Sequence, residues 1–181
     1  MATFYTIGHS TRSIEAFIGL LEAARVQLAI DVRTIPKSRY NPQFNTEAIA
    51  PALQTAGIGY RHMPALGGLR HAKKGAGPSP NGFWDNENFR NYADYAATGE
   101  FRLGLGELRA LGGVQICAIF CAEALWWQCH RRIITDYLLA AGDTVNHIMG
   151  GGHQEPARMT EAAVTGADGA ITYPPAQGLL L

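Results

Sequence analysis

Residues 114–123 read VQICAIFCAE, a largely apolar run that ends in a cysteine, an alanine and a glutamate. Such short apolar runs are typical of strands buried on both faces of a parallel sheet. A second run of this kind covers residues 26–32. Three shorter runs predict further strands, at residues 4–7, 58–63 and 145–148. The stretch at 114–123 is therefore expected to be a central strand of a parallel sheet.

Segments with helical apolar spacing alternate with these strands. They lie at residues 13–24, 46–56, 86–98, 100–111 and 125–141. Ser13 is a favourable N-cap, and Gly57 and Gly142 are favourable helix ends. Alternating strands and helices of these lengths predict an α/β fold, with a mostly parallel sheet of about five strands flanked by helices and joined by right-handed crossovers.

The domain organisation follows from length and composition. The chain has 181 residues, of which 47% are hydrophobic and 17% charged. This length suits one domain with a substantial core. We expect a single α/β domain over residues 1–149 and an irregular C-terminal tail over residues 150–181. Residues 64–85 are rich in Gly, Pro, Lys and Asn. Loops this long are uncommon and are usually functional, so this one is expected to act as a lid.

Charge and cysteine content exclude several classes of protein. Fifteen basic residues balance fifteen acidic ones, which argues against coating nucleic acid by bulk electrostatics. Twelve of the basic residues are Arg and three are Lys. Three cysteines are too few for a disulfide framework and fit a reducing cytoplasm. No apolar run is long enough to cross a membrane, and no secretory signal is visible. A cytoplasmic protein without a membrane partner is therefore expected.

Reactive side chains follow four of the expected strands. They lie in residues 8–10, 31–33, 61–62 and 121–123. Ligands of open α/β sheets bind beyond the carboxyl ends of the strands, and a random distribution would scatter these groups. We therefore predict a functional site at this edge of the sheet.

Four residues at this edge are candidate catalytic groups: Cys121, Glu123, Asp31 and His9. Cys121 lies where a strand meets a helix, a position that lowers a thiol pKa, but free cysteine is also a common core residue. Glu123 suits acid–base chemistry or a simple helix-dipole interaction. Asp31 can orient a ligand or pair with Arg33, and His9 can be a general base or a loop histidine that satisfies the backbone.

A second group would bind substrate: Arg33, Arg39, Arg70, His130 and Arg131. Arg131 has no carboxylate at helical spacing and is expected to reach back over residues 121–123 as an anion clamp. Solvated arginines and a core position for His130 are the alternatives. Cys121, Cys129 and His130 match no familiar zinc motif, and consecutive helical residues diverge by about 100°. No metal and no cofactor are therefore predicted.

Several short motifs, in order, carry a family resemblance. They are Thr6–Ser10; Asp31–Arg33 with Pro36, Ser38-Arg39 and Pro42–Phe44; Leu66–Arg70; Phe89 with Tyr92–Tyr95; and Cys121–Glu123 with Cys129–Arg131. Over residues 4–148 the chain resembles the family called domain of unknown function 488. The resemblance implies a small bacterial cytoplasmic α/β protein with the site described above, and it assigns no activity. This chain has Leu125-Trp126-Trp127 where the family pattern tends to have a proline.

Three hypotheses about function follow. The first is an enzyme that acts on an anionic, phosphate-bearing substrate such as a nucleotide or nucleic acid, bound at an Arg/Cys/Glu cleft. The second is a non-catalytic module that binds a nucleotide or nucleic acid with the same arginines. The third is an interaction domain in which Cys121 is only structural. The proposed site requires that one cleft be lined by Cys121, Glu123, Asp31, Arg33 and Arg131. It is wrong if Arg33 and Arg131 point away from each other.

Overall fold

A computed structural model describes residues 1–75 and 77–176. Its centre is a six-stranded sheet in the order β3-β2-β4-β1-β5-β6. The strands are β1 (Thr3–Gly8), β2 (Leu28–Asp31), β3 (Gly59–His62), β4 (Cys117–Cys121), β5 (Thr144–Gly150) and β6 (His153–Pro156). All neighbours pair in parallel except β5 and β6, which are antiparallel. The predicted α/β fold with a mostly parallel sheet is confirmed.

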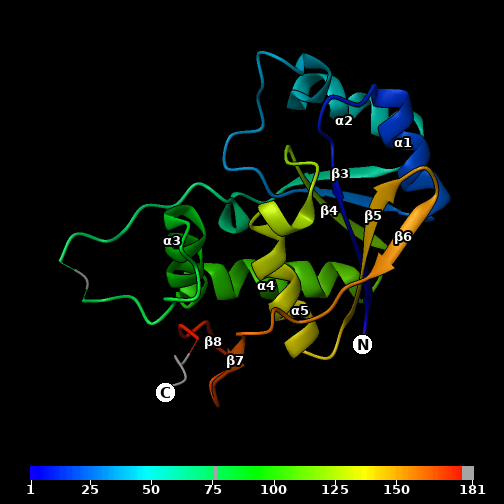
Figure 1. Cartoon of the computed structure of the whole chain (residues 1–181). Coiled ribbons are helices and arrows are strands. Elements are labelled where there is room, and N and C mark those ends of the chain that lie inside the picture. The colour runs from blue at the N-terminus through cyan, green and yellow to red at the C-terminus, as the bar shows by residue number, and fades with distance from the viewer. Residues whose placement is uncertain (76, 177–181) are drawn as a thin grey trace.

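Helices cover both faces of this sheet (Figure 1). They are α1 (Ile14–Ala23), α2 (Thr46–Thr55), α3 (Glu87–Ala96), α4 (Gly99–Gly112) and α5 (Arg131–Ala140). The alternation of side chains along β4 assigns the layers. Ala118 and Phe120 pack with α1 and α2 in one core, whereas Cys117, Ile119 and Cys121 pack with α3, α4 and α5 in the other. Cys121 therefore faces α5.

The last helix begins later than its apolar spacing predicts. The sequence favours a helix from residue 125, but the structure has a single 3₁₀ turn at Trp126–Gln128, and Cys129 is extended, with φ −129° and ψ 148°. The first helical residue of α5 is Arg131. Trp126 explains the delay, because its ring stacks on His147 at 4.2 Å and its Nε1 donates to Glu155 Oε1 at 2.8 Å. These contacts hold residues 126–128 against β5 and β6.

The segment after Met149 is more ordered than the irregular tail expected from its sequence. Its β6 extends the sheet, and β7 (Val164–Thr165) pairs with β8 (Ile171–Thr172). Ile171 and Tyr173 are fully buried. Their burial supplies the tertiary contacts that fold a segment lacking apolar periodicity. Residues 177–181 of the expected tail lie outside the described residues.

The predicted lid-like loop has little regular structure where it is described. One 3₁₀ turn, Pro64–Leu66, opens it, and residues 67–75 and 77–86 contain no helix or strand. Its return leg is tied to the C-terminal segment, because Phe83 donates its backbone N–H to Tyr173 and Tyr173 donates its own to Asn81 Oδ1. Among the described residues, no helix has both the length and the apolar character needed to cross a bilayer.

Candidate functional site

The carboxyl ends of four parallel strands meet at one edge of the sheet, as the sequence predicts. Gly8 of β1 lies opposite Cys121 of β4, and Asp31 of β2 lies opposite His62 of β3. Because β4 lies between β1 and β2, these ends are neighbours. The residues that end these strands therefore lie along one edge of the sheet.

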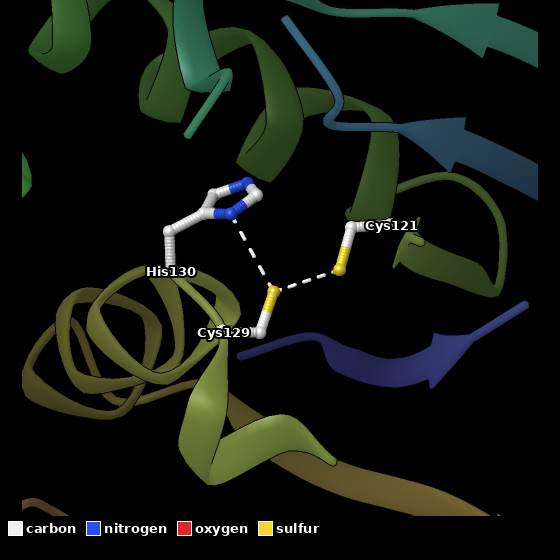
Figure 2. A group of neighbouring side chains, drawn as sticks. All are labelled: Cys121, Cys129 and His130. Atoms are coloured by element: carbon white, nitrogen blue, oxygen red, sulfur yellow. Dashed lines mark hydrogen bonds between the residues drawn. The ribbon is translucent and has the colours of Figure 1, made fainter. Parts of the chain in front are cut away.

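Two cysteine sulfurs meet at this edge. Cys121 Sγ at the end of β4 lies 2.7 Å from Cys129 Sγ, and both thiols are free (Figure 2). Cys129 Sγ also lies 3.5 Å from His130 Nδ1. The extended backbone at Cys129 directs its side chain back to the strand end, which a helix from residue 125 would not do. The 3₁₀ turn at Trp126–Gln128 therefore places Cys129 beside Cys121.

Two further backbone features shape the pair. Gly8 lets residues 122–124 lie across the end of β1, because a Cβ at Gly8 would come 1.9 Å from the carbonyl oxygen of Glu123. Gly68 lets the ring of His130 approach the backbone closely, because a Cβ at Gly68 would lie 2.3 Å from His130 Nδ1. The ring is fixed from the other side, where Nε2 lies 2.8 Å from the carbonyl oxygen of Val32. Nε2 is the donor in that contact, so Nδ1 faces the sulfurs.

Arg131 lies behind the sulfurs, away from solvent. Its side chain is 1% exposed, its Nε lies 3.3 Å from Cys129 Sγ, and its Nη2 donates to the carbonyl oxygen of Glu123 at 2.6 Å. Its backbone N–H also points to Cys129 Sγ, at 3.5 Å. Within the described chain Arg131 makes no salt bridge to a carboxylate. The sulfur of Cys129 is therefore the group that can neutralise this buried cation.

The two thiols differ in acidity. Burial alone would raise the pKa of Cys129, but the hydrogen bond from Cys121 and the nearby His130 and Arg131 outweigh it and hold that pKa well below its ordinary value. Burial, together with the hydrogen bond to Cys129, raises the pKa of Cys121 well above its ordinary value. Cys129 is therefore the thiolate of the pair, and Cys121 is the thiol that donates to it.

A separate polar network occupies the ends of β1 and β2. Asp31 is fully buried and accepts from Arg33 Nε at 2.8 Å and from the Tyr60 hydroxyl at 2.9 Å. Arg33 Nη2 also donates to the carbonyl oxygen of Phe44, and Nη1 lies 3.3 Å from His9 Nε2. Asp31 and Arg33 thus form an internal ion pair, which is one of the two roles that their spacing allows.

His9 belongs to this network as a neutral group. Its Nδ1 lies 2.9 Å from the carbonyl oxygen of Ser10, so Nδ1 is the donor and Nε2 presents a lone pair to Arg33. The ring stacks on Phe44 at 4.2 Å. Burial lowers the pKa of His9 to about 4, against the opposing hydrogen bond to Ser10. These contacts position Arg33.

A cavity of about 410 Å³ opens over the sulfurs. The residues that line it include Cys121, Cys129, His130, Arg33, Ala122 and Glu123. The Glu123 side chain is exposed. In the described part of the chain, no residue accepts a hydrogen bond from the backbone N–H groups of Ala122 and Glu123. Ile35 and Leu69, which are 63% and 56% exposed, also line the cavity.

The other predicted anion ligands lie elsewhere. Arg39 is exposed and does not line the cavity. Arg70 lies 3.6 Å above the ring of Tyr95, donates to the carbonyl oxygens of Pro64 and Gly67, and lines a different cavity. The structure thus brings Cys121, Glu123, Arg33 and His130 to one cavity, with Asp31, His9 and Arg131 behind its walls. Of the five residues expected to line one cleft, Asp31 and Arg131 do not line it. It does not bring Arg39 and Arg70 there.

Cys129 is the site residue that helical spacing hides. Its position four residues before Ile133 suits the apolar side of a helix, which favours a core interpretation. The sequence signal that points to Cys129 is the motif Cys129-His130-Arg131, which directly precedes the apolar face of α5. The later start of α5 also removes one of the two arguments against a metal site. The donor atoms of Cys121, Cys129 and His130 lie within 4.8 Å of one another, so the divergence expected of consecutive helical residues does not apply.

Comparison with known proteins agrees with the resemblance carried by the motifs. The family model named Domain of unknown function DUF488 matches residues 13–138, which is more than half of the chain and includes Cys121, Cys129, His130 and Arg131. Searches of the curated proteins and of the solved structures found no match. The chain therefore belongs to the DUF488 family.

Proposed function

We propose that the protein is a cysteine-thiolate enzyme, with Cys129 as its nucleophile and the cavity above it as its substrate site. The observation that carries the proposal is the contact between Cys129 Sγ and the buried guanidinium of Arg131, at the floor of a cavity. A thiolate is a far better nucleophile than a thiol, and a cationic neighbour together with a helix N-terminus is the usual way to stabilise one.

An anionic substrate remains the class expected from the sequence, and two local features support it. The backbone N–H groups of Ala122 and Glu123, which have no acceptor among the described residues, can donate hydrogen bonds to a negatively charged group of the substrate or of the transition state. Arg33 adds a nearby cation, although Asp31 already neutralises most of its charge. The cavity volume suits a small molecule, and Ile35 and Leu69 provide apolar surface at its rim.

Alkylation kinetics test the nucleophile directly. Iodoacetamide should modify Cys129 alone, and the rate at pH 6 should stay within about threefold of the rate at pH 8. An ordinary thiol with a pKa near 8.5 would slow roughly 50- to 100-fold over that range. Cys129→Ser should abolish the reaction, and Cys117→Ser is the matched control. Slow modification of Cys129 with an ordinary pH dependence would rule out the proposed nucleophile.

Protection from alkylation tests the substrate class. Nucleotides, sugar phosphates, anionic disulfides and a single-stranded oligonucleotide are each added before iodoacetamide. We expect at least one small anion to slow modification of Cys129 more than tenfold. If the oligonucleotide alone protects, and if it binds Cys129→Ser as tightly as the wild type, the non-catalytic nucleic-acid module is the better description.

A further inference from the structure

We propose that Cys121 and Cys129 form a dithiol–disulfide couple, in which Cys129 attacks the electrophilic sulfur of a small anionic disulfide and Cys121 resolves the product. This inference rests on the proposed function, since it needs Cys129 as nucleophile. It adds the class of reaction and the role of Cys121.

The geometry of the two sulfurs carries the inference. They come from different elements, the end of β4 and the turn before α5, and lie 2.7 Å apart (Figure 2). A disulfide needs about 2.05 Å, so bond formation requires a movement of less than about 1 Å. Cys117 provides an internal contrast. It lies on the same strand and the same face, but among the described residues its sulfur makes a hydrogen bond only to the backbone oxygen of Gln115, at 3.5 Å.

The reaction balances with these two thiols and one external disulfide. The Cys129 thiolate attacks one sulfur of R–S–S–R′, which forms a mixed disulfide and releases R′–S⁻. The sulfur of Cys121 then attacks Cys129 Sγ and forms the Cys121–Cys129 bond, while its proton passes to the departing sulfur to give R–SH. One disulfide bond is broken and one is formed. Two equivalents of a low-molecular-weight thiol return the enzyme to its dithiol form.

Arg131 favours the reduced state of this couple. In the reduced protein the buried guanidinium faces the Cys129 thiolate at 3.3 Å. Oxidation removes that negative charge, and among the described residues no carboxylate is within ion-pair distance to replace it. An uncompensated buried charge is costly, so the disulfide is easily reduced. This is the property required of a couple that must be regenerated by an ordinary cellular thiol.

The competing use of these sulfurs is to bind a thiophilic metal ion together with His130. Arg131 argues against it, because its Nε and its backbone N–H both point to Cys129 Sγ. A divalent cation there would face a buried guanidinium across one sulfur atom. We therefore favour the redox role, and the test below measures metal as well.

The experiment uses oxidised glutathione as the disulfide and the purified, reduced full-length chain as the enzyme. The protein is mixed with oxidised glutathione, the reaction is quenched with an alkylating agent, and the intact mass of the protein is measured by mass spectrometry. It is then cleaved after Glu123 by a glutamate-specific protease, without reduction. Cleavage there puts Cys121 and Cys129 on separate peptides, which stay together only if a disulfide joins them.

We expect the wild type to lose two hydrogen atoms, to retain no glutathione and to yield linked peptides. Cys121→Ser should stop at a stable glutathione adduct on Cys129, Cys129→Ser should not react, and Cys117→Ser should behave as the wild type. Substitution of Arg131 by Met should raise by at least about tenfold the ratio of reduced to oxidised glutathione at which half of the protein is oxidised, and Arg131→Lys, which keeps the positive charge, should give a ratio between those of Met and the wild type. The wild-type result does not depend on whether any variant folds.

Three outcomes would overturn the inference. One is a wild-type adduct as long-lived as that of Cys121→Ser. Another is rapid alkylation of Cys129 with no linked peptides, which leaves the proposed nucleophile intact but removes the couple. The third is stoichiometric zinc in the purified protein that must be chelated before either cysteine reacts. Slow alkylation of Cys129, by contrast, would contradict the proposed function itself.

Discussion

Arg131 lies directly behind Cys129, with Nε 3.3 Å from Sγ and with only 1% of its side chain exposed. Two alternatives would each leave one buried charge uncompensated: a protonated thiol would leave the guanidinium without a counter-ion, and a neutral guanidine would leave the thiolate without one. Burial lowers the pKa of Arg131, but the two cysteines outweigh burial and raise that pKa, so the guanidinium stays charged. The thiolate and the guanidinium therefore depend on each other.

Removal of the guanidinium should return Cys129 to an ordinary thiol. In Arg131→Met we expect the rate of iodoacetamide modification at pH 6.5 to fall at least about tenfold, because a thiol with an ordinary pKa near 8.5 is only about 1% ionised at that pH. Arg131→Lys should fall between, because an ammonium keeps the charge but not the two-sided contact with Cys129 and Glu123. Arg132→Met is the matched control, since Arg132 contacts Thr160 instead. Equal rates in all four proteins would contradict the pairing.

The buried pair of Asp31 and Arg33 should contribute more to stability than any exposed pair. Asp31→Asn leaves Arg33, which is 7% exposed, without a counter-ion, so we expect a loss of about 3–5 kcal/mol in urea unfolding. Glu107→Gln breaks the exposed pair with Arg61 and should change stability by no more than about 1 kcal/mol. Similar losses for both variants would mean that Arg33 is reached by water or has another partner.

The parts of the site that were predictable from sequence are those set by strand ends. An apolar run that stops at a polar residue locates Cys121 and Asp31, because parallel strands place all their carboxyl ends at one edge. The expected gathering of four arginines at one site does not occur, because Arg39 and Arg70 lie away from the cavity. Arg39 and Arg70 lie in loops, where the direction of a side chain depends on tertiary contacts such as that of Arg70 with Tyr95. Cys129 was hidden because stacking of Trp126 on His147 overrides helical spacing.

Gly68 should be essential to the position of His130. A Cβ at Gly68 would lie 2.3 Å from His130 Nδ1, and the ring cannot simply move aside, since Nε2 donates a hydrogen bond to the carbonyl oxygen of Val32 and Tyr92 packs against the ring at 5.0 Å. We expect Gly68→Ala to cost about 1–3 kcal/mol and to alter the alkylation rate of Cys129. Gly106→Ala is the control, because nothing lies within 4 Å of its Cβ inside α4. That variant should be stabilised by about 0.5–1 kcal/mol.

Two buried histidines should make the fold sensitive to acid. His9 and His147 are each 1% exposed, and burial is the main reason that the pKa of each is lowered to about 4. In the unfolded chain both return to about 6.5. Between pH 6.5 and pH 4 the unfolded state therefore binds more protons than the folded state. Stability must fall as the pH falls through that window and must be fully present above it.

His147 allows this linkage to be isolated. Its Nδ1 lies 2.8 Å from Thr6 Oγ1, its Nε2 has no hydrogen-bond partner in the described chain, and the charge of Arg131 further lowers its pKa. His147→Gln removes the titration but keeps a polar side chain. The difference in unfolding free energy between wild type and variant should shrink by on the order of 3 kcal/mol from pH 7 to pH 4. His71→Gln, at an exposed histidine, should leave the difference constant. Parallel stability curves for His147→Gln and the wild type would mean that His147 is already protonated in the folded protein, with Nε2 bound to an acceptor.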